Sequence, residues 1–203
     1  LLLWSDISSA AWVQVFLAML CLYLLLSVMG ADWRIAIFGG LAYGITTYNI
    51  DILEAGHTTK MIALAFAPGV LAGMVLAFRG NYLLGGSLMA LFISMQVYAN
   101  HVQITYYTLI IAGIYVLAQL VEAVQHKALA RWGKHVVIWS LALAIGFACN
   151  LSKLWPTYEY GQETIRGKSE LKASADKGDG LSKDYLFGWS YGVCESMTLL
   201  VPH

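Results

Sequence analysis

The sequence predicts an all-α polytopic membrane protein with about six transmembrane helices and an outer-face segment of helix and loop. Of its 203 residues, 59% are hydrophobic and only 12% are charged, about half the charged fraction of a typical soluble domain. The apolar residues are gathered in runs close to the roughly 20 residues that a helix needs to cross the hydrocarbon core. These runs are continuous and rich in Leu, Ala and Met rather than alternating, which argues against a membrane β-barrel.

Six apolar runs follow one another along the chain, and each predicts one membrane-crossing helix. The second and third runs are short, near the lower limit for a span. Several glycines lie within or beside the runs, where they allow helices to approach closely. The six runs cover residues 10–30, 34–50, 61–78, 82–99, 103–124 and 134–154. We therefore expect residues 1–154 to form a transmembrane helical bundle.

The remaining residues, 155–203, predict an extracytoplasmic loop segment that leads into a further, truncated membrane region. The chain begins at Leu1 without a methionine and ends on "LLVPH" as a new apolar run starts, so we expect an internal fragment of a longer protein. No signal-peptide pattern is visible at the start. The formal net charge is zero, which favours neither nucleic acid nor an acidic partner.

The basic residues of the short connections predict the orientation in the membrane. One set of alternate connections contains Arg34, Arg79 and the loop "VQHKALARWGK", whereas Lys60 is the only Lys or Arg in the opposite set. An excess of Lys and Arg marks the cytoplasmic side. The first residue, the loop around Lys60 and residues 155–203 are therefore expected on the extracytoplasmic side of a multi-pass protein in the bilayer.

The stretch "LEAGHTTK", residues 53–60, concentrates reactive side chains between two apolar runs. Glu54, His57 and Lys60 are spaced three apart, so that a helical turn would stack them on one side. A carboxylate that accepts a hydrogen bond from one imidazole nitrogen leaves the other nitrogen free to act as a base. We predict Glu54 and His57 as a catalytic pair and Lys60 as a phosphate ligand. The alternative is a solvated interfacial loop with a local ion pair.

A second polar cluster lies in "YANHVQITYY", residues 98–107. His101 and Gln103 are candidate substrate-binding residues, while the tyrosines around them are typical of interfacial anchors. His57 and His101 could in principle share a metal ion. Neither has a second ligand at a spacing such as HxxxH, so a divalent metal is possible but not indicated, and no cofactor is predicted.

The C-terminal part contains the remaining candidate substrate-binding residues. "RGK" carries two cations around a glycine that could clamp a phosphate, and we predict that it approaches residues 54–60 to form one basic pocket with Lys60. Two aromatic side chains could stack on a sugar ring or anchor the chain at the interface. A solvated loop of mixed charge is the alternative. These candidates are Glu159, Arg166, Lys168, Trp189, Tyr191 and Glu195.

Four long motifs, in the same order along essentially the whole chain, resemble the YfhO-type bacterial membrane protein family, in the form found in Bacteroidetes-like bacteria. The resemblance implies a relative of the GT-C glycosyltransferases, which take sugars from polyprenyl-phosphate carriers on the outer face of the cytoplasmic (inner) membrane. It also implies that the main acidic residue of such enzymes lies upstream of Leu1. The motifs are "GGLAYGITTYNIDILEAGHTTK", "LFISMQVYANHVQITYY", "TYEYGQETIRGKSEL" and "GLSKDYLFGWSYGVCESMTLLVP".

The expected function is transfer of a sugar from a polyprenyl-phosphate donor to a cell-envelope polymer or lipid acceptor. Cations stabilise the leaving phosphate, and a positioned base deprotonates the acceptor hydroxyl. The alternative is a transporter or flippase for a lipid-linked or anionic envelope precursor. A transporter would favour ionisable groups near the bilayer midplane and internal repeats, and the sequence shows neither clearly. A purely structural membrane subunit is a third possibility.

Overall fold

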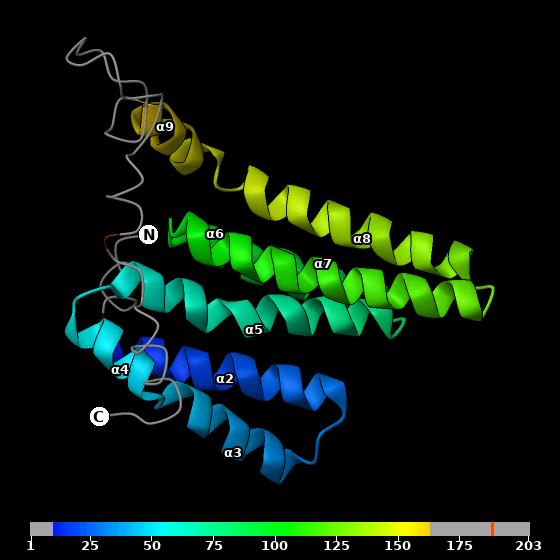
Figure 1. Cartoon of the computed structure of the whole chain (residues 1–203), viewed down its shortest axis with the longest axis horizontal. Helices are drawn as coiled ribbons and strands as arrows, with labels where there is room; N and C mark the ends of the chain where they lie inside the picture. Colours follow the sequence, from blue (N-terminus) through cyan, green and yellow to red (C-terminus); the bar gives the residue numbers. More distant parts are fainter. Residues whose placement is uncertain (1–9, 163–187, 189–203) are drawn as a thin grey trace. The chain divides into compact units, whose positions relative to one another are not determined.

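The computed structural model describes residues 10–162 and residue 188, and within them it contains helices and no strand (Figure 1). This confirms the all-α prediction. The chain divides into two compact units, Leu1–Lys153 and Leu154–His203. The helices are α2 Ala11–Met29, α3 Trp33–Gly44, α4 Thr47–Glu54, α5 Thr58–Phe78, α6 Tyr82–Tyr98, α7 Val102–Gln125, α8 Leu129–Ala148 and α9 Leu151–Gln162.

Three of these helices, α2, α5 and α7, are long and apolar enough to cross a membrane, and a fourth span results if α8 and α9 count as one bent span. The remaining apolar helix, α6, has only 17 residues, a length of about 25 Å at 1.5 Å per residue. The fold is thus that of a helical protein with three to four candidate spans. The six predicted spans are not confirmed.

The predicted span over residues 34–50 is divided into α3 and α4 by a break at Ile45 and Thr46. Two side chains donate hydrogen bonds to the carbonyl oxygen of Tyr43 at this break. The hydroxyl of Thr46 donates to it at 3.2 Å and the Nδ2 of Asn49 at 2.7 Å. Side chains of this kind compete with the helical hydrogen bonds of the backbone, so the apolar run continues while the helix does not.

The central helix of the first unit is α5, which lies between α2 and α6 (Figure 1). Of its most apolar stretch, 67% is buried, against 22% for α2 and 28% for α7. Two glycines bring α5 and α6 together, because a Cβ on Gly73 would lie 2.5 Å from the backbone nitrogen of Met89 and a Cβ on Gly85 would collide with the backbone of Ala77. The predicted role of glycine in close helix packing is confirmed at these two positions.

A proline within α5 gives this helix a hydrogen bond to α3. Pro68 has no backbone N–H, so the carbonyl oxygen of Leu64, four residues earlier, has no helical donor. The hydroxyl of Tyr43 donates to that oxygen at 3.0 Å. A bond lost within one helix is therefore replaced by a tertiary bond from another.

Successive connections in the first unit alternate between two ends of the bundle (Figure 1). We call the end made of residues 45–57, 99–101 and 149–153 the α4 end. The opposite end, made of residues 30–34, 79–81 and 126–135, is the basic end. The basic end carries Arg34, Arg79, Lys127, Arg131 and Lys134, whereas His57 and His101 lie at the α4 end.

Side chains on the outside of the helices are largely apolar. Large hydrophobic residues are exposed along α3, α7 and α8, for example Phe38 at 73%, Leu117 at 62% and Leu141 at 58%. A soluble protein rarely exposes apolar surface on this scale. These faces therefore indicate contact with a lipid bilayer, in agreement with the candidate spans.

Candidate functional site

The α4 end contains the predicted residues Glu54, His57 and His101, and Lys60 lies directly beside it at the start of α5. His57 is the residue before α5, Lys60 lies in the first turn of α5, and His101 is the residue before α7. The starts of α5 and α7 are held against each other through a small apolar cluster of Ala63, Ala99 and Ile104. Packing of apolar side chains just inside the bundle thus positions the polar groups at its end.

The pKa of His101 is shifted by its surroundings. Burial lowers the pKa of His101 below the usual value for histidine, and the positive charges of Lys60 and His57 lower it further. A positive charge lowers the pKa of a histidine in this way only when it lies nearby, because charges farther apart than a Debye length are largely screened. His101 is therefore held in its neutral form to lower pH than a solvated histidine, beside two groups that can carry positive charge.

His101 is also left with an unused hydrogen-bonding atom. Its Nδ1 is buried and has no hydrogen-bond partner. The residue before it, Asn100, has a positive φ of 56°, so the chain turns sharply before α7 begins. Buried polar atoms are rarely left without a partner, and this one lies beside the Lys60 and His57 charges.

Lys60 lies against an aromatic ring. Its Nζ is 5.0 Å from the centroid of the Tyr48 ring in α4, a cation–π contact, and its side chain is half-buried. The ring face attracts a cation electrostatically. Sequence reasoning did not include Tyr48 in the site, because it lies within the apolar run 34–50 that predicted a span.

The predicted stacking of Glu54, His57 and Lys60 on one helical turn is wrong. Glu54 ends α4 and Thr58 begins α5, so a reversal of the chain separates the two helices. This reversal needs the positive φ of 76° at Gly56, which glycine adopts readily. Glu54 and His57 are both exposed, and within residues 10–162 no hydrogen bond or ion pair joins them. Their catalytic role stays a prediction.

Of the remaining predicted residues, the structure describes Gln103 and Glu159. Gln103 is exposed in α7 and donates from its Nε2 to the hydroxyl oxygen of Tyr107 at 2.8 Å, so its amide lies along the surface of its own helix. Glu159 is exposed in α9, in the second unit. The basic pocket predicted for Lys60 with the "RGK" sequence involves residues outside the described part, as do the aromatic and acidic candidates. These are Arg166, Lys168, Trp189, Tyr191 and Glu195.

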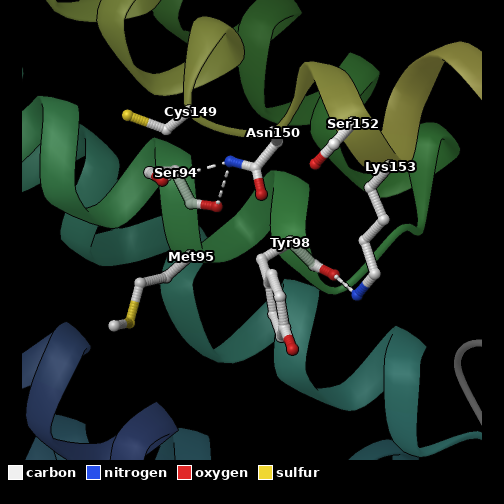
Figure 2. A pocket seen from close by; sticks show the side chains of 7 residues that line it. All are labelled: Ser94, Met95, Tyr98, Cys149, Asn150, Ser152 and Lys153. Atoms are coloured by element: carbon white, nitrogen blue, oxygen red, sulfur yellow. Dashed lines mark hydrogen bonds between the residues drawn. The ribbon is translucent and has the colours of Figure 1, made fainter. Parts of the chain in front are cut away.

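A cavity of about 580 Å³ at the same end was not predicted from the sequence (Figure 2). It lies where α8 ends and α9 begins, against the last turns of α6. The sequence feature that could have indicated this cavity is "CNLSK", residues 149–153. This polar sequence directly follows an apolar run, and it lies within the predicted span 134–154. The lining residues are Ser94, Met95, Tyr98, Cys149, Asn150, Ser152 and Lys153.

Within the described ranges 10–162 and 188, no group of three or more His, Cys, Asp or Glu side chains has an arrangement that could hold a metal ion. His57 and His101 are two nitrogen ligands at most, and a stable zinc site uses at least three protein ligands. The described side chains of the α4 end and the start of α5 supply cations, imidazoles, hydroxyls and the carboxylates of Asp51 and Glu54.

Comparison of the chain with protein-family models, with curated proteins and with solved structures found no match.

Proposed function

We propose that the α4 end binds the phosphate of a lipid-linked sugar and that the protein transfers this sugar to a cell-envelope acceptor. The observation that carries the proposal is the packing of the starts of α5 and α7 through Ala63, Ala99 and Ile104. This packing puts Lys60, His57 and the buried Nδ1 of His101 at one end of the bundle. A cation such as Lys60 stabilises the negative charge that develops on a leaving phosphate. The imidazole of His101 can donate a hydrogen bond to the phosphate, which leaves His57 to accept the proton of the acceptor hydroxyl.

The roles follow from the exposure of each side chain. His57 is exposed and can approach an acceptor hydroxyl as the general base. Lys60, held by the Tyr48 ring, supplies a fixed positive charge for the donor phosphate. The resemblance to YfhO-type proteins and their GT-C relatives agrees with this division of roles, because a polyprenyl-phosphate donor presents a phosphate at the membrane surface.

The proposal includes an orientation in a bacterial cytoplasmic membrane. The basic end, with five Lys and Arg residues, faces the cytoplasm according to the positive-inside rule, and the α4 end faces outward. We infer six crossings, in which α3 with α4 forms one broken span, α6 a short span and α8 with the start of α9 the last span. Broken helices are tolerated in membranes where they lie against protein or line a cavity.

A transfer assay tests the proposal. Membranes that contain the full protein are supplied with a labelled polyprenyl-phosphate sugar, and formation of the labelled envelope product is measured. His57→Ala should reduce transfer about 10²–10⁴-fold, the usual contribution of a general base. Glu54→Gln should cost less, since it removes no base. The control His126→Ala changes an exposed histidine at the basic end and should leave transfer unchanged.

A second pair of variants separates binding from chemistry. Lys60→Ala should mainly raise the donor KM, and Lys60→Arg should partly restore it, because the charge is kept while the geometry changes. Lys134→Ala, an exposed lysine at the basic end, is the matched control. Full transfer by the folded His57→Ala and Lys60→Ala proteins would contradict the site.

One observation favours a transporter as the second candidate. The Nε2 of Gln96, a fully buried residue of α6, donates to the carbonyl oxygen of Ala63 and to the hydroxyl of Thr108, while its Oε1 has no partner. Polar groups inside a bundle and a broken helix such as α8–α9 are features of substrate pathways. Movement of an intact lipid-linked sugar from one leaflet of a vesicle bilayer to the other, without cleavage of its phosphate bond, would favour this alternative.

A further inference from the structure

The cavity at the α8–α9 break has polar groups on one side and apolar surface beside it. Figure 2 shows the Ser94 hydroxyl and the Asn150 amide directed toward each other, while Lys153 reaches the backbone carbonyl of Tyr98. Its volume of about 580 Å³ is within the usual range of small-molecule sites, roughly 300–1,000 Å³. The question is which ligand chemistry these groups fit.

The side chain of Asn150 fixes one requirement of the ligand. Its Nδ2 donates to the carbonyl oxygens of Ser94 at 3.0 Å and Gly146 at 2.9 Å, and to the Ser94 hydroxyl oxygen at 3.1 Å. Because two of these partners are carbonyls, the atom that faces them must be the nitrogen. The Oδ1 therefore faces the cavity (Figure 2). The residue lines the cavity, so this acceptor can receive a donor from a ligand there.

Lys153 and Ser152 fix the second requirement. The Nζ of Lys153 donates to the carbonyl oxygen of Tyr98 at 2.8 Å and lies 3.5 Å from the centroid of the Tyr98 ring. These contacts hold a positive charge at the edge of the cavity. The hydroxyl of Ser152, an exposed residue, adds a donor elsewhere on the lining, on the side of Asn150 (Figure 2). An ammonium suits a phosphate ester, and a hydroxyl can donate to a further oxygen of the same headgroup.

The surroundings favour a lipid as the source of this phosphate. Leu141 and Ile145, on the turns of α8 that precede the cavity, are 58% and 56% exposed, and α8 is apolar enough to belong to a membrane span. Acyl chains could lie along this face while the headgroup enters the cavity. Tyrosine and lysine at a helix end are also typical of headgroup depth.

We propose that this cavity binds the headgroup of an anionic, hydroxyl-bearing membrane lipid. The phosphate lies at Lys153, a further headgroup oxygen accepts from Ser152, and a headgroup hydroxyl donates to the Oδ1 of Asn150. The site is separate from the proposed transfer residues and requires no transfer activity. A protein that binds such a lipid at the break between α8 and α9 has a preference for membranes that contain it.

Alkylation of Cys149 tests the proposal, because this thiol lines the cavity and is exposed. The full protein is placed in nanodiscs of phosphatidylcholine, alone or mixed with phosphatidylglycerol or phosphatidic acid, and the rate of maleimide addition to the Cys149 peptide is followed by mass spectrometry. Phosphatidylglycerol, which has the phosphate and the hydroxyls, should slow the reaction about tenfold, the factor for a site that is roughly nine-tenths occupied. Phosphatidic acid carries the same sign of charge without the headgroup hydroxyls and should protect less.

Two variants connect the protection to the named residues. Lys153→Gln and Ser152→Ala should each reduce the protection by phosphatidylglycerol, whereas Lys134→Gln at the basic end should retain it. Asn150 is left unchanged because its Nδ2 holds α8 to α6. Equal alkylation rates in all lipids would overturn the proposal. Equal protection by phosphatidic acid would overturn the recognition of a hydroxyl. Equal protection by soluble glycerol 3-phosphate in detergent would overturn the assignment to a lipid.

Discussion

At the basic end of the bundle, the side chain of Arg79 donates from Nη1 to the carbonyl oxygen of Val28 and from Nη2 to that of Met29, at 2.9 Å for the second bond. At the α4 end, the corresponding cation of the same helix, Lys60, lies over the Tyr48 ring instead. Arg79 therefore closes the C-terminus of α2, where carbonyl groups lack helical donors. Within residues 10–162, Lys60 is placed against a ring rather than against the carbonyl groups of a helix end.

The histidines differ in the same way. His135, at the basic end, stacks on Phe78 with ring centroids 4.7 Å apart, and its Nδ1 lies 3.0 Å from the carbonyl oxygen of Ala77. His101, at the α4 end, has a buried Nδ1 with no partner. Arg79 and His135 at the basic end thus contribute to holding the helices together, while Lys60 and His101 keep hydrogen-bonding capacity and charge that a ligand can use.

The contrast between the basic end and the α4 end requires that they lie on opposite sides of the membrane. We expect Thr58→Cys to react with a membrane-impermeant maleimide in intact cells, and Ala128→Cys to react only after the cells are permeabilised. The expected difference is all or none, because the reagent does not cross the bilayer. Reaction of both cysteines from the same side would refute the opposite placement of the two ends.

Stability measurements should separate the structural cation from the available one. Arg79→Ala should lower the free energy of unfolding by about 1–2 kcal/mol, since it removes two charge-assisted hydrogen bonds. Lys60→Ala should cost about 0.5 kcal/mol, the size of an exposed cation–π contact. Unfolding in mixed micelles with increasing fractions of sodium dodecyl sulfate measures both. An equal or larger loss for Lys60→Ala would show that Lys60, too, serves the fold.

The smallest expected effect is on the titration of His101. Lys60→Met removes a positive charge that disfavours the imidazolium form, so the pKa of His101 should rise. It should remain below the usual value for histidine, because burial is the larger cause of the lowering. Titration of the imidazole signals by NMR measures the change, with Lys134→Met as the control that should leave the pKa unaltered. A fall in this pKa in Lys60→Met would contradict the proximity of the two groups.

The sequence was informative where apolar length decides the structure. The runs that predicted helices lie over α2, α5, α6, α7 and α8, because a long apolar run in a chain of this composition folds as a helix. It was uninformative where side chains decide the ends. The bonds from Thr46 and Asn49 to the Tyr43 carbonyl divide a continuous apolar run, and no apolar pattern marks such a break.

The candidate site was predicted as residue types rather than as geometry. His57, Lys60 and His101 were found because ionisable groups stand out between apolar runs. The contact of Lys60 with Tyr48 and the cavity at Asn150 depend on how α4, α6 and α8 pack, which spacing along the chain does not encode. The Glu54–His57 stacking failed for the same reason, since the turn at Gly56 separates residues that a single helix would align.

The bond from Tyr43 to the carbonyl oxygen of Leu64 has a consequence for the order of assembly. In lipid, α5 alone would carry a carbonyl that neither its own backbone nor water can satisfy, because Pro68 supplies no donor. Packing of α3 against α5 provides the missing hydrogen-bond donor, the hydroxyl of Tyr43. An inserted α5 therefore lacks this hydrogen bond until α3 packs against it, so the central helix of the bundle depends on its neighbour for the pairing of its own backbone.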